Sequence, residues 1–375
     1  MMLIDPIFRK TFQDMEQEHL QLHRTINAYR EQGEDLDSRL QEVLSNWGTA
    51  SFIHRDKLGE ISKTFTDDQK DLHREFIKSS PYYQIVQEAP FYWQIMNKPF
   101  GYAGDADLMR LIYRNQFEGE TPFGRLIHQQ AVDTKACQAV RNRKELLYNQ
   151  IMDTIRQHQG EEVRILSVAA GPAQEIQDVL SEQGDDIGPS FLALDHDIHT
   201  IRKTNQMCKD KRLRYALANV FHIMKGHHTI ACPRSIFQQI CNPKRDLNGW
   251  KRFFGSLLYE IDHLKRNSFD LVYSAGLYDY IRTDNHTDLK GAVALTKNLY
   301  NFVKPGGSLI IGNFSPNNPQ DLKFMMEYVY DWFLIYRDKQ ELFDFTRSIP
   351  KEEIGTVSIL EEPLRINYFL KIDKI

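Results

Sequence analysis

The N-terminal part of the chain carries apolar residues at the spacing of amphipathic helices, separated by polar stretches. The clearest stretches cover residues 8–26 and 36–44. Asp67 and Asp68 stand where they would cap a further helix over 69–77. We therefore predict a domain of packed helices over residues 1–145.

The pattern changes after about residue 163, where short β-branched or apolar runs alternate with helical segments. This alternation predicts a parallel α/β sheet with right-handed crossovers, closed by a hairpin at its edge. We assign it to residues 146–375, and it includes a predicted aromatic helix from Phe324 to Tyr336. The predicted strands are 164–168, 191–194, 214–218, 269–274, 308–312, 357–360 and 366–372.

Composition narrows the class of protein. A chain of 375 residues is long enough for two domains, and a formal net charge of −4 argues against nucleic acid as a partner. The four cysteines form no CxxC pair or disulfide framework, which favours a reducing, cytoplasmic compartment. No apolar run of about 18 residues is present, so we expect no transmembrane segment.

The ends of the predicted strands carry the candidate chemistry. The first strand runs into small residues around Ala169 and Gly171, which permit close approach of a ligand to the backbone, and then into Glu175. Asp195 ends the second strand about 24 residues after Gly171, where an acidic side chain can bind both ribose hydroxyls of an adenosine. A tight turn and a helix cap are the structural alternatives for these two features.

Further along, Asn219 follows the third strand and Ser274-Ala275-Gly276 ends the fourth. A Lys-Pro-Gly-Gly turn at 304–307 precedes the fifth strand. In this order the features resemble class I S-adenosylmethionine (SAM)-dependent methyltransferases, which implies a Rossmann-like seven-stranded sheet carrying an N-terminal α-helical cap. Alanines at 169 and 173 depart from the glycines that the family often has. The resemblance implies that SAM is bound by Ala169, Gly171, Glu175, Asp195, His196, Asn219, Ser274 and Gly276.

A second resemblance covers both halves of the chain. It rests on Lys98–Asp105, Ala139–Arg143, Ser274–Tyr280 and Asp331–Arg337, which are similar to bacterial methyltransferases identified as making 3-hydroxy fatty-acid methyl esters, the extracellular-factor signals. It implies a small amphipathic acceptor with an apolar body and an anionic head.

A carboxylate acceptor is already ionised at neutral pH and needs no general base, so orientation and desolvation would dominate catalysis. A phenol or amine would need a base, for which Asp279 or a histidine would have to serve. In the functional interpretation, the catalytic residues are Tyr278, Tyr280 and Arg337, and the acceptor is bound by Tyr102, Asp105, Arg143, Asn313 and Trp332. For each of these residues, core packing, a turn or a salt bridge is the alternative.

Two alternatives to this function stay open: methyl transfer to a phenol, a polyketide or a protein side chain, and SAM binding without catalysis. His222, His227, His228 and Cys232 match no standard zinc spacing, so we predict no metal. The basic stretch at 222–256 is expected to be a solvated face, and the N-terminal helices are a candidate homodimer surface.

Overall fold

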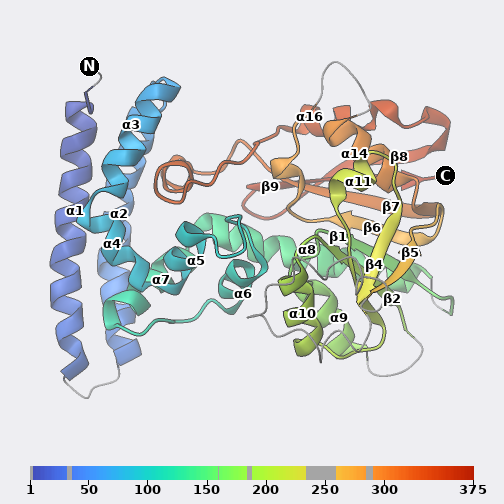
Figure 1. Ribbon diagram of the computed structural model, residues 1–375, viewed down its shortest axis with the longest axis horizontal. Coiled ribbons are helices and arrows are strands. Elements are labelled where there is room, and N and C mark those ends of the chain that lie inside the picture. The colour runs from blue at the N-terminus through green and yellow to red at the C-terminus, as the bar shows by residue number, and fades with distance from the viewer. Residues whose placement is uncertain (1–2, 32–35, 159, 184–187, 234–258, 284–289) are drawn as a thin grey trace, which may run out of the picture. The chain divides into compact units, whose positions relative to one another are not determined.

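The computed structural model describes residues 3–31, 36–158, 160–183, 188–233, 259–283 and 290–375 (Figure 1). The chain divides into two compact units. The first comprises residues 1–141 and 317–333, and the second comprises residues 142–316 and 334–375. Each unit is described separately below. Residues 317–333, which the sequence pattern assigned to the sheet domain, thus pack with the helices.

The helical unit contains only helices and turns among its described residues. Its elements are α1 (Pro6–Asn27), η1 (Ala28–Glu31), α2 (Leu36–Ser62), α3 (Asp67–Lys78), α4 (Pro81–Ile85), η2 (Val86–Glu88), α5 (Pro90–Asn97), α6 (Ala106–Arg114), α7 (Pro122–Val132), the first turns of α8 (Lys135–Gln157), α15 (Gln320–Phe324) and the π-helical turn η4 (Met325–Val329).

Local capping explains where several of these helices begin. Asp5 accepts hydrogen bonds from the backbone N–H groups of Ile7 and Phe8, and Pro6 occupies the first position of α1. Helix α3 is capped by Thr66, which forms a reciprocal capping box with Gln69. The prediction that Asp67 and Asp68 cap this helix was therefore wrong, because they form its first turn.

The second unit is built on a nine-stranded mixed sheet with the strand order β5-β4-β3-β2-β1-β6-β7-β9-β8. Strands β1, β2, β3, β6 and β7 are parallel neighbours, while β4, β5, β8 and β9 join by antiparallel pairing. The strands are β1 (Arg164–Val168), β2 (Ser190–Asp195), β3 (Leu213–Leu217), β4 (Thr229–Pro233), β5 (Tyr259–His263), β6 (Phe269–Ser274), β7 (Val303–Phe314), β8 (Ile354–Glu361) and β9 (Asn367–Lys374).

Helices cover both faces of this sheet. On one face, α8, α9 (Gln174–Glu182) and α10 (Ile198–Met207) form an apolar core with β1, β2 and β3. On the other face, α11 (Val220–Met224), α14 (Gly291–Tyr300) and α16 (Lys339–Phe343) pack on the same strands and on β6 and β7. The remaining short turns are η3 (Tyr278–Tyr280), η5 (Asp344–Ser348) and η6 (Lys351–Glu353). This is the three-layer arrangement that the alternating pattern predicts.

Two sequence predictions need correction. The sheet has nine strands and not seven, because the long connection after β3 contributes the antiparallel strands β4 and β5. The aromatic segment 324–336 is not one helix: α15 ends at Phe324, η4 ends at Val329, and Asp331 adopts a left-handed conformation. The predicted basic patch lies mostly in 234–258, outside the described residues.

Candidate functional site

The candidate site lies at the C-terminal ends of β1, β2 and β6. Strand β1 lies between β2 and β6, and the strand order reverses there: the chain runs outward from β1 through β2 to β3, then returns to continue at β6 on the other side of β1. Ligands of doubly wound sheets bind outside the strand ends at such a switch point. Six of the eight residues that the sequence nominated as cofactor-binding lie at these strand ends, whereas Glu175 lies in the first turn of α9 and Asn219 follows β3.

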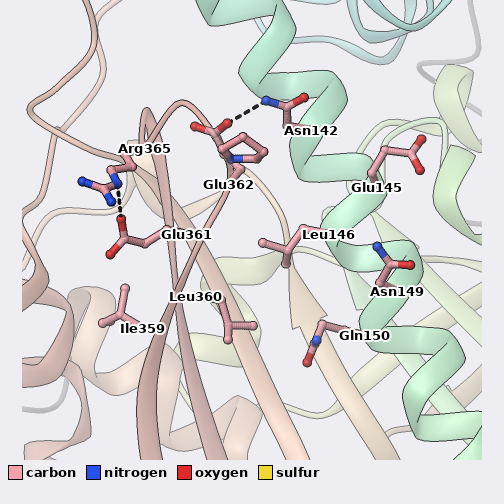
Figure 2. Close-up of a pocket in the computed structure, with 11 residues that line it drawn as sticks. Asn142, Glu145, Leu146, Asn149, Gln150, Ile359, Leu360, Glu361, Glu362 and Arg365 are labelled. Atoms are coloured by element: carbon pink, nitrogen blue, oxygen red, sulfur yellow. Dashed lines mark hydrogen bonds and ion pairs between the residues drawn. The ribbon is translucent and has the colours of Figure 1, made fainter.

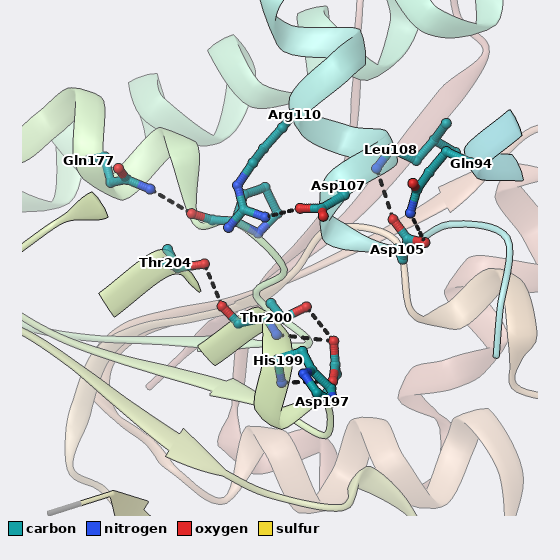
Figure 3. A network of polar contacts seen from close by, with 11 residues as sticks. Gln94, Asp105, Asp107, Leu108, Arg110, Gln177, Asp197, His199, Thr200 and Thr204 are labelled. Atoms are coloured by element: carbon teal, nitrogen blue, oxygen red, sulfur yellow. Dashed lines mark hydrogen bonds and ion pairs between the residues drawn. The ribbon is translucent and has the colours of Figure 1, made fainter. Parts of the chain in front are cut away.

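The loop after β1 has an unusual backbone. Ala169, Gly171 and Ala173 all adopt left-handed conformations, with φ values of 54°, 54° and 49°. For an alanine this conformation costs free energy, which the surrounding contacts must offset. Gln177 braces the loop by donating to the Pro172 carbonyl at 2.6 Å (Figure 3). A Cβ atom on Gly171 would meet no atom within 4 Å, so this side of the loop is open.

Asp195 connects this loop to the end of β2. Its carboxylate accepts the backbone N–H of Gly171 at 2.9 Å and that of Asp197 at 2.9 Å, and only 6% of the residue is exposed. A carboxylate has about four lone-pair positions, so acceptor capacity remains after these two bonds. The hydrogen bond therefore fixes the position of the buried Asp195 carboxylate relative to the backbone of Gly171.

The next two predicted cofactor residues flank Asp195. His196 Nδ1 lies 3.4 Å from Asp195 Oδ1, which raises the pKa of His196, and 59% of its side chain is exposed. Asn219 follows β3 and caps α11 by accepting the backbone N–H of Phe221. Both residues lie at the same edge of the sheet as Asp195.

At the end of β6, Ser274 and Gly276 have distinct roles. The buried Ser274 hydroxyl donates to the Val168 carbonyl at 2.9 Å and so ties β6 to β1. A Cβ atom on Gly276 would lie 2.8 Å from Nη1 of Arg143, which also approaches the Ala275 carbonyl at 3.4 Å. Glycine at 276 therefore allows the Arg143 guanidinium of α8 to lie against this strand end.

Two buried carboxylates accompany Arg143. Glu175 accepts a 2.6 Å hydrogen bond from the Tyr273 hydroxyl, and burial raises the pKa of Glu175 although Tyr273 and Arg143 oppose the shift. Asp279 accepts the backbone N–H of Phe314 at 2.6 Å, and burial raises its pKa to about 6 against the charges of Arg143 and Arg337. The Tyr273–Glu175 pair has no signal in the sequence, because it forms only where the first turn of α9 packs against β6.

The three residues that the sequence predicted to be catalytic lie in three different environments. Tyr278 is fully buried with its hydroxyl 3.1 Å from Thr296 Oγ1, which is the core-packing alternative. Tyr280 is 43% exposed on the turn after β6. Arg337 is 1% exposed, and its guanidinium donates to groups of the protein itself: the Tyr278 and Ile281 carbonyls, Asn313 Oδ1 and Thr283 Oγ1.

These bonds show how Arg337 and Asn313 are used. The Asn313 amide donates to the Phe314 and Ile335 carbonyls while its oxygen accepts from Arg337 at 2.6 Å. The two side chains together hold the segment after β6 against the end of β7. An Arg337 that also bound an acceptor carboxylate would have to give up part of this network.

The remaining predicted acceptor residues lie in the helical unit. Asp105 is fully buried, caps α6 through the Leu108 N–H at 2.8 Å and accepts Gln94 Nε2 at 2.7 Å (Figure 3). Burial raises the pKa of Asp105. Tyr102 and Trp332 are partly buried in the same unit. Its role as the N-cap of α6 is thus sufficient to explain why an aspartate stands at position 105.

A groove of about 810 Å³ lies elsewhere on the sheet unit, between α8 and the β8–β9 hairpin (Figure 2). Asn142 donates to Glu362 at 2.8 Å across it, and Arg365 pairs with Glu361 at 3.2 Å. None of the residues that the sequence nominated lines this groove. Its lining residues are Asn142, Glu145, Leu146, Asn149, Gln150, Ile359, Leu360, Glu361, Glu362, Pro363 and Arg365.

The described part of the chain lacks two features. No group of three or more His, Cys, Asp or Glu side chains there is arranged to hold a metal ion. Among the same residues, no helix has the length and apolar character needed to span a bilayer.

Comparison with known proteins gives one family match. Residues 101–228 match the family model described as "Putative methyltransferase". The matched segment contains β1, β2 and β3 with the Gly171 loop and Asp195, and it agrees with the expectation of a methyltransferase. No curated protein matches this chain significantly.

Similar solved structures are distant. One, described as a possible exported protein from Bordetella parapertussis, has 12% identity and a TM-score of 0.48 over 87% of this chain and 95% of its own. The DszA carbon methyltransferase has 13% identity and a TM-score of 0.45 over 89% and 68%. A SAM-dependent methyltransferase from Aquifex aeolicus has 10% identity and a TM-score of 0.34 over 60% and 88%. Similarity this remote carries no argument about substrate.

Proposed function

We propose that this chain is a SAM-dependent methyltransferase whose cofactor binds at the ends of β1, β2 and β6. The observation that carries the proposal is the hydrogen bond between the buried Asp195 carboxylate and the Gly171 backbone, at the switch point of the sheet. It places an anion suited to ribose hydroxyls beside a loop that a ligand can approach closely. The family match over 101–228 supports the same activity.

The residues present fit such a cofactor. Asp195 has unused acceptor capacity for a ribose, Gly171 is open where a Cβ would stand, and Ser274 and Gly276 keep the β6 end small. His196 and Asn219 would flank the base, and Glu175 would lie near the amino-acid end. When bound, SAM would supply an electrophilic methyl group on a sulfonium.

The acceptor that we propose is a small amphipathic acid, with the carboxylate of a 3-hydroxy fatty acid first. The support is the resemblance of the sequence motifs to enzymes that make such methyl esters. The methyl group would pass to a carboxylate oxygen, leaving S-adenosylhomocysteine (SAH) and releasing no proton. The Arg143 guanidinium lies at the β6 end, so we assign to it the head-group role first expected of Arg337.

One observation favours a second candidate acceptor that bears a hydroxyl, such as a phenol. Asp279 is a buried carboxylate just after β6 with a pKa of about 6, close to the pH at which a general base works well. A hydroxyl acceptor would lose its proton to such a base during transfer. A carboxylate acceptor would not need Asp279 for proton transfer.

Incubation with methyl-labelled SAM tests both acceptors. The protein would be mixed with 3-hydroxydecanoic acid, with its methyl ester, and with a panel of phenols, and products would be identified by mass spectrometry. We expect label on the free acid and none on the ester. Label on a phenol that Asp279→Asn abolishes would establish the second candidate. Label on none of these, nor on any molecule of a cell extract, would contradict the transferase proposal.

A further inference from the structure

The helical unit contains a buried arginine that forms no ion pair with any described residue. Arg55 of α2 is 1% exposed. Both of its hydrogen bonds leave from Nη2, one to Gln130 Oε1 at 3.0 Å and one to the Tyr92 hydroxyl at 3.4 Å. Its Nε is buried and has no hydrogen-bond partner. A guanidinium has five N–H donors, so this one is short of acceptors.

The phenol and imidazole groups around Arg55 supply no negative charge. Burial raises the pKa of Tyr82 and of Tyr330 well above the usual value, so both phenols are neutral at pH 7. Burial also lowers the pKa of the nearby His19 to about 3, which leaves that ring uncharged. Asp321 lies within electrostatic range, but within the described residues no carboxylate forms an ion pair with Arg55.

The surroundings are otherwise aromatic. The Arg55 guanidinium lies 5.5 Å from the ring of Phe52. Tyr92 and Tyr330 pack with ring centroids 5.5 Å apart, and Tyr82 packs on Phe12 at 5.8 Å. The Tyr82 hydroxyl is buried near Tyr92 and Arg55, and it forms no well-aligned hydrogen bond with any described residue. A charge buried in such surroundings is costly unless an anion pairs with it.

We propose that the Arg55 cluster, formed by Arg55, Tyr82, Tyr92, Gln130 and Tyr330, is a binding site for the carboxylate of a monocarboxylic acid with an apolar chain. A planar carboxylate matches the guanidinium fork, and its second oxygen can accept from the Tyr82 hydroxyl. The aromatic walls suit an aliphatic chain. Every residue of the Arg55 cluster belongs to the helical unit, and none of them was assigned a part in the methyl transfer.

Titration of the full chain with octanoate tests the proposal, without SAM. The Arg55 Nε–H resonance, assigned by its loss in Arg55→Lys, should give way to a second peak in slow exchange, because entry to a site 1% exposed requires local opening. Loss of charge-assisted bonds should weaken binding about 10- to 100-fold in Arg55→Met. Arg114→Met is the matched control, since Arg114 is already paired with Glu118 at 2.6 Å.

Two further ligands distinguish what is recognised. If acetate shifts the Arg55 resonance at the same concentration as octanoate does, the apolar chain is not recognised and the proposed ligand class is wrong. If octanol binds as well as octanoate, or if Arg55→Met binds octanoate like the wild type, the charge is not recognised and the proposal fails. An Arg55 resonance that no carboxylate moves also overturns it, and this measurement needs only wild-type protein and the Lys variant.

Discussion

Replacing Asp195 by asparagine is the sharpest test of the candidate site. The two carboxylate oxygens serve the backbone N–H groups of Gly171 and Asp197, each at 2.9 Å. An asparagine side chain has one acceptor oxygen, so one of these N–H groups would face an amide NH₂. An unmet buried donor costs about 1–3 kcal/mol, which corresponds to a lower Tm by about 2–12 °C for a unit of this size.

Asp195→Asn should reduce the affinity for SAH by a larger factor than it reduces the stability of the fold. Hydrogen bonds to a charged acceptor contribute about 1.5–3 kcal/mol, and the variant loses the charge that would accept the ribose hydroxyls. We therefore expect Asp195→Asn to weaken SAH binding by about 10- to 100-fold. Isothermal titration calorimetry with SAH measures this directly, at a temperature well below the lowered Tm.

Asp197→Asn is the matched control for this prediction. Asp197 lies two residues away and caps α10 by accepting the N–H groups of His199 and Thr200 (Figure 3). Asparagine caps helices about as well as aspartate, so stability and SAH binding should change little. Equal weakening in both variants, or an Asp195→Asn protein that binds SAH within threefold of the wild type, would refute the reasoning.

Three further predictions concern residues at the strand ends. Tyr278→Phe should cost about 1 kcal/mol in urea unfolding and leave turnover unchanged, because it removes one bond to Thr296; a large loss of kcat at full stability would restore the catalytic interpretation. Arg337→Met should destabilise the protein by on the order of 3 kcal/mol or more, because it leaves several buried hydrogen-bond acceptors unmet. A folded Arg337→Met protein that unfolds normally but does not bind the methyl acceptor would count against this structural role. The pKa of Asp279 is about 6 in the folded state, against an ordinary 3.8, so the folded state holds this proton more tightly than the unfolded state does. The free energy of unfolding therefore falls as the pH rises from about 4 to about 6, and the contribution of Asp279 is level above that range. Asp279→Asn should abolish about 2 kcal/mol of the loss between pH 4.5 and 7.5, measured by urea unfolding at both values, and an unchanged pH profile would contradict the assignment.

The sheet was largely predictable from the chain because its strands are short, apolar and regularly spaced. The runs at 164–168 and 269–274 match β1 and β6 residue for residue. Strand β5, Tyr-Glu-Ile-Asp-His, was missed because it is an exposed edge strand with charged residues. The helix expected over 324–336 failed because its apolar residues reflect burial in the helical unit rather than one continuous helix.

The candidate site divides along similar lines. The positions of Gly171, Asp195 and Gly276 were predictable because each residue ends or closely follows a strand that the local sequence pattern identifies. The partners of Arg337 were not, since its acceptors include backbone carbonyls of Tyr278 and Ile281 more than 50 residues away, which carry no side-chain signature. The sequence gives no sign that Arg55 is unusual, because the absence of an ion pair with the described residues is revealed only by tertiary packing.

Hydrogen exchange with and without SAH tests the central claim most directly, because it locates the cofactor on the intact chain. The proposed site predicts that SAH slows amide exchange over residues 169–175, 195–197 and 274–276, and that Asp195→Asn reduces this protection at the same SAH concentration. The groove between α8 and the β8–β9 hairpin serves as the internal comparison (Figure 2). Protection confined to 142–150 and 359–365, or no protection anywhere at saturating SAH, would contradict the account.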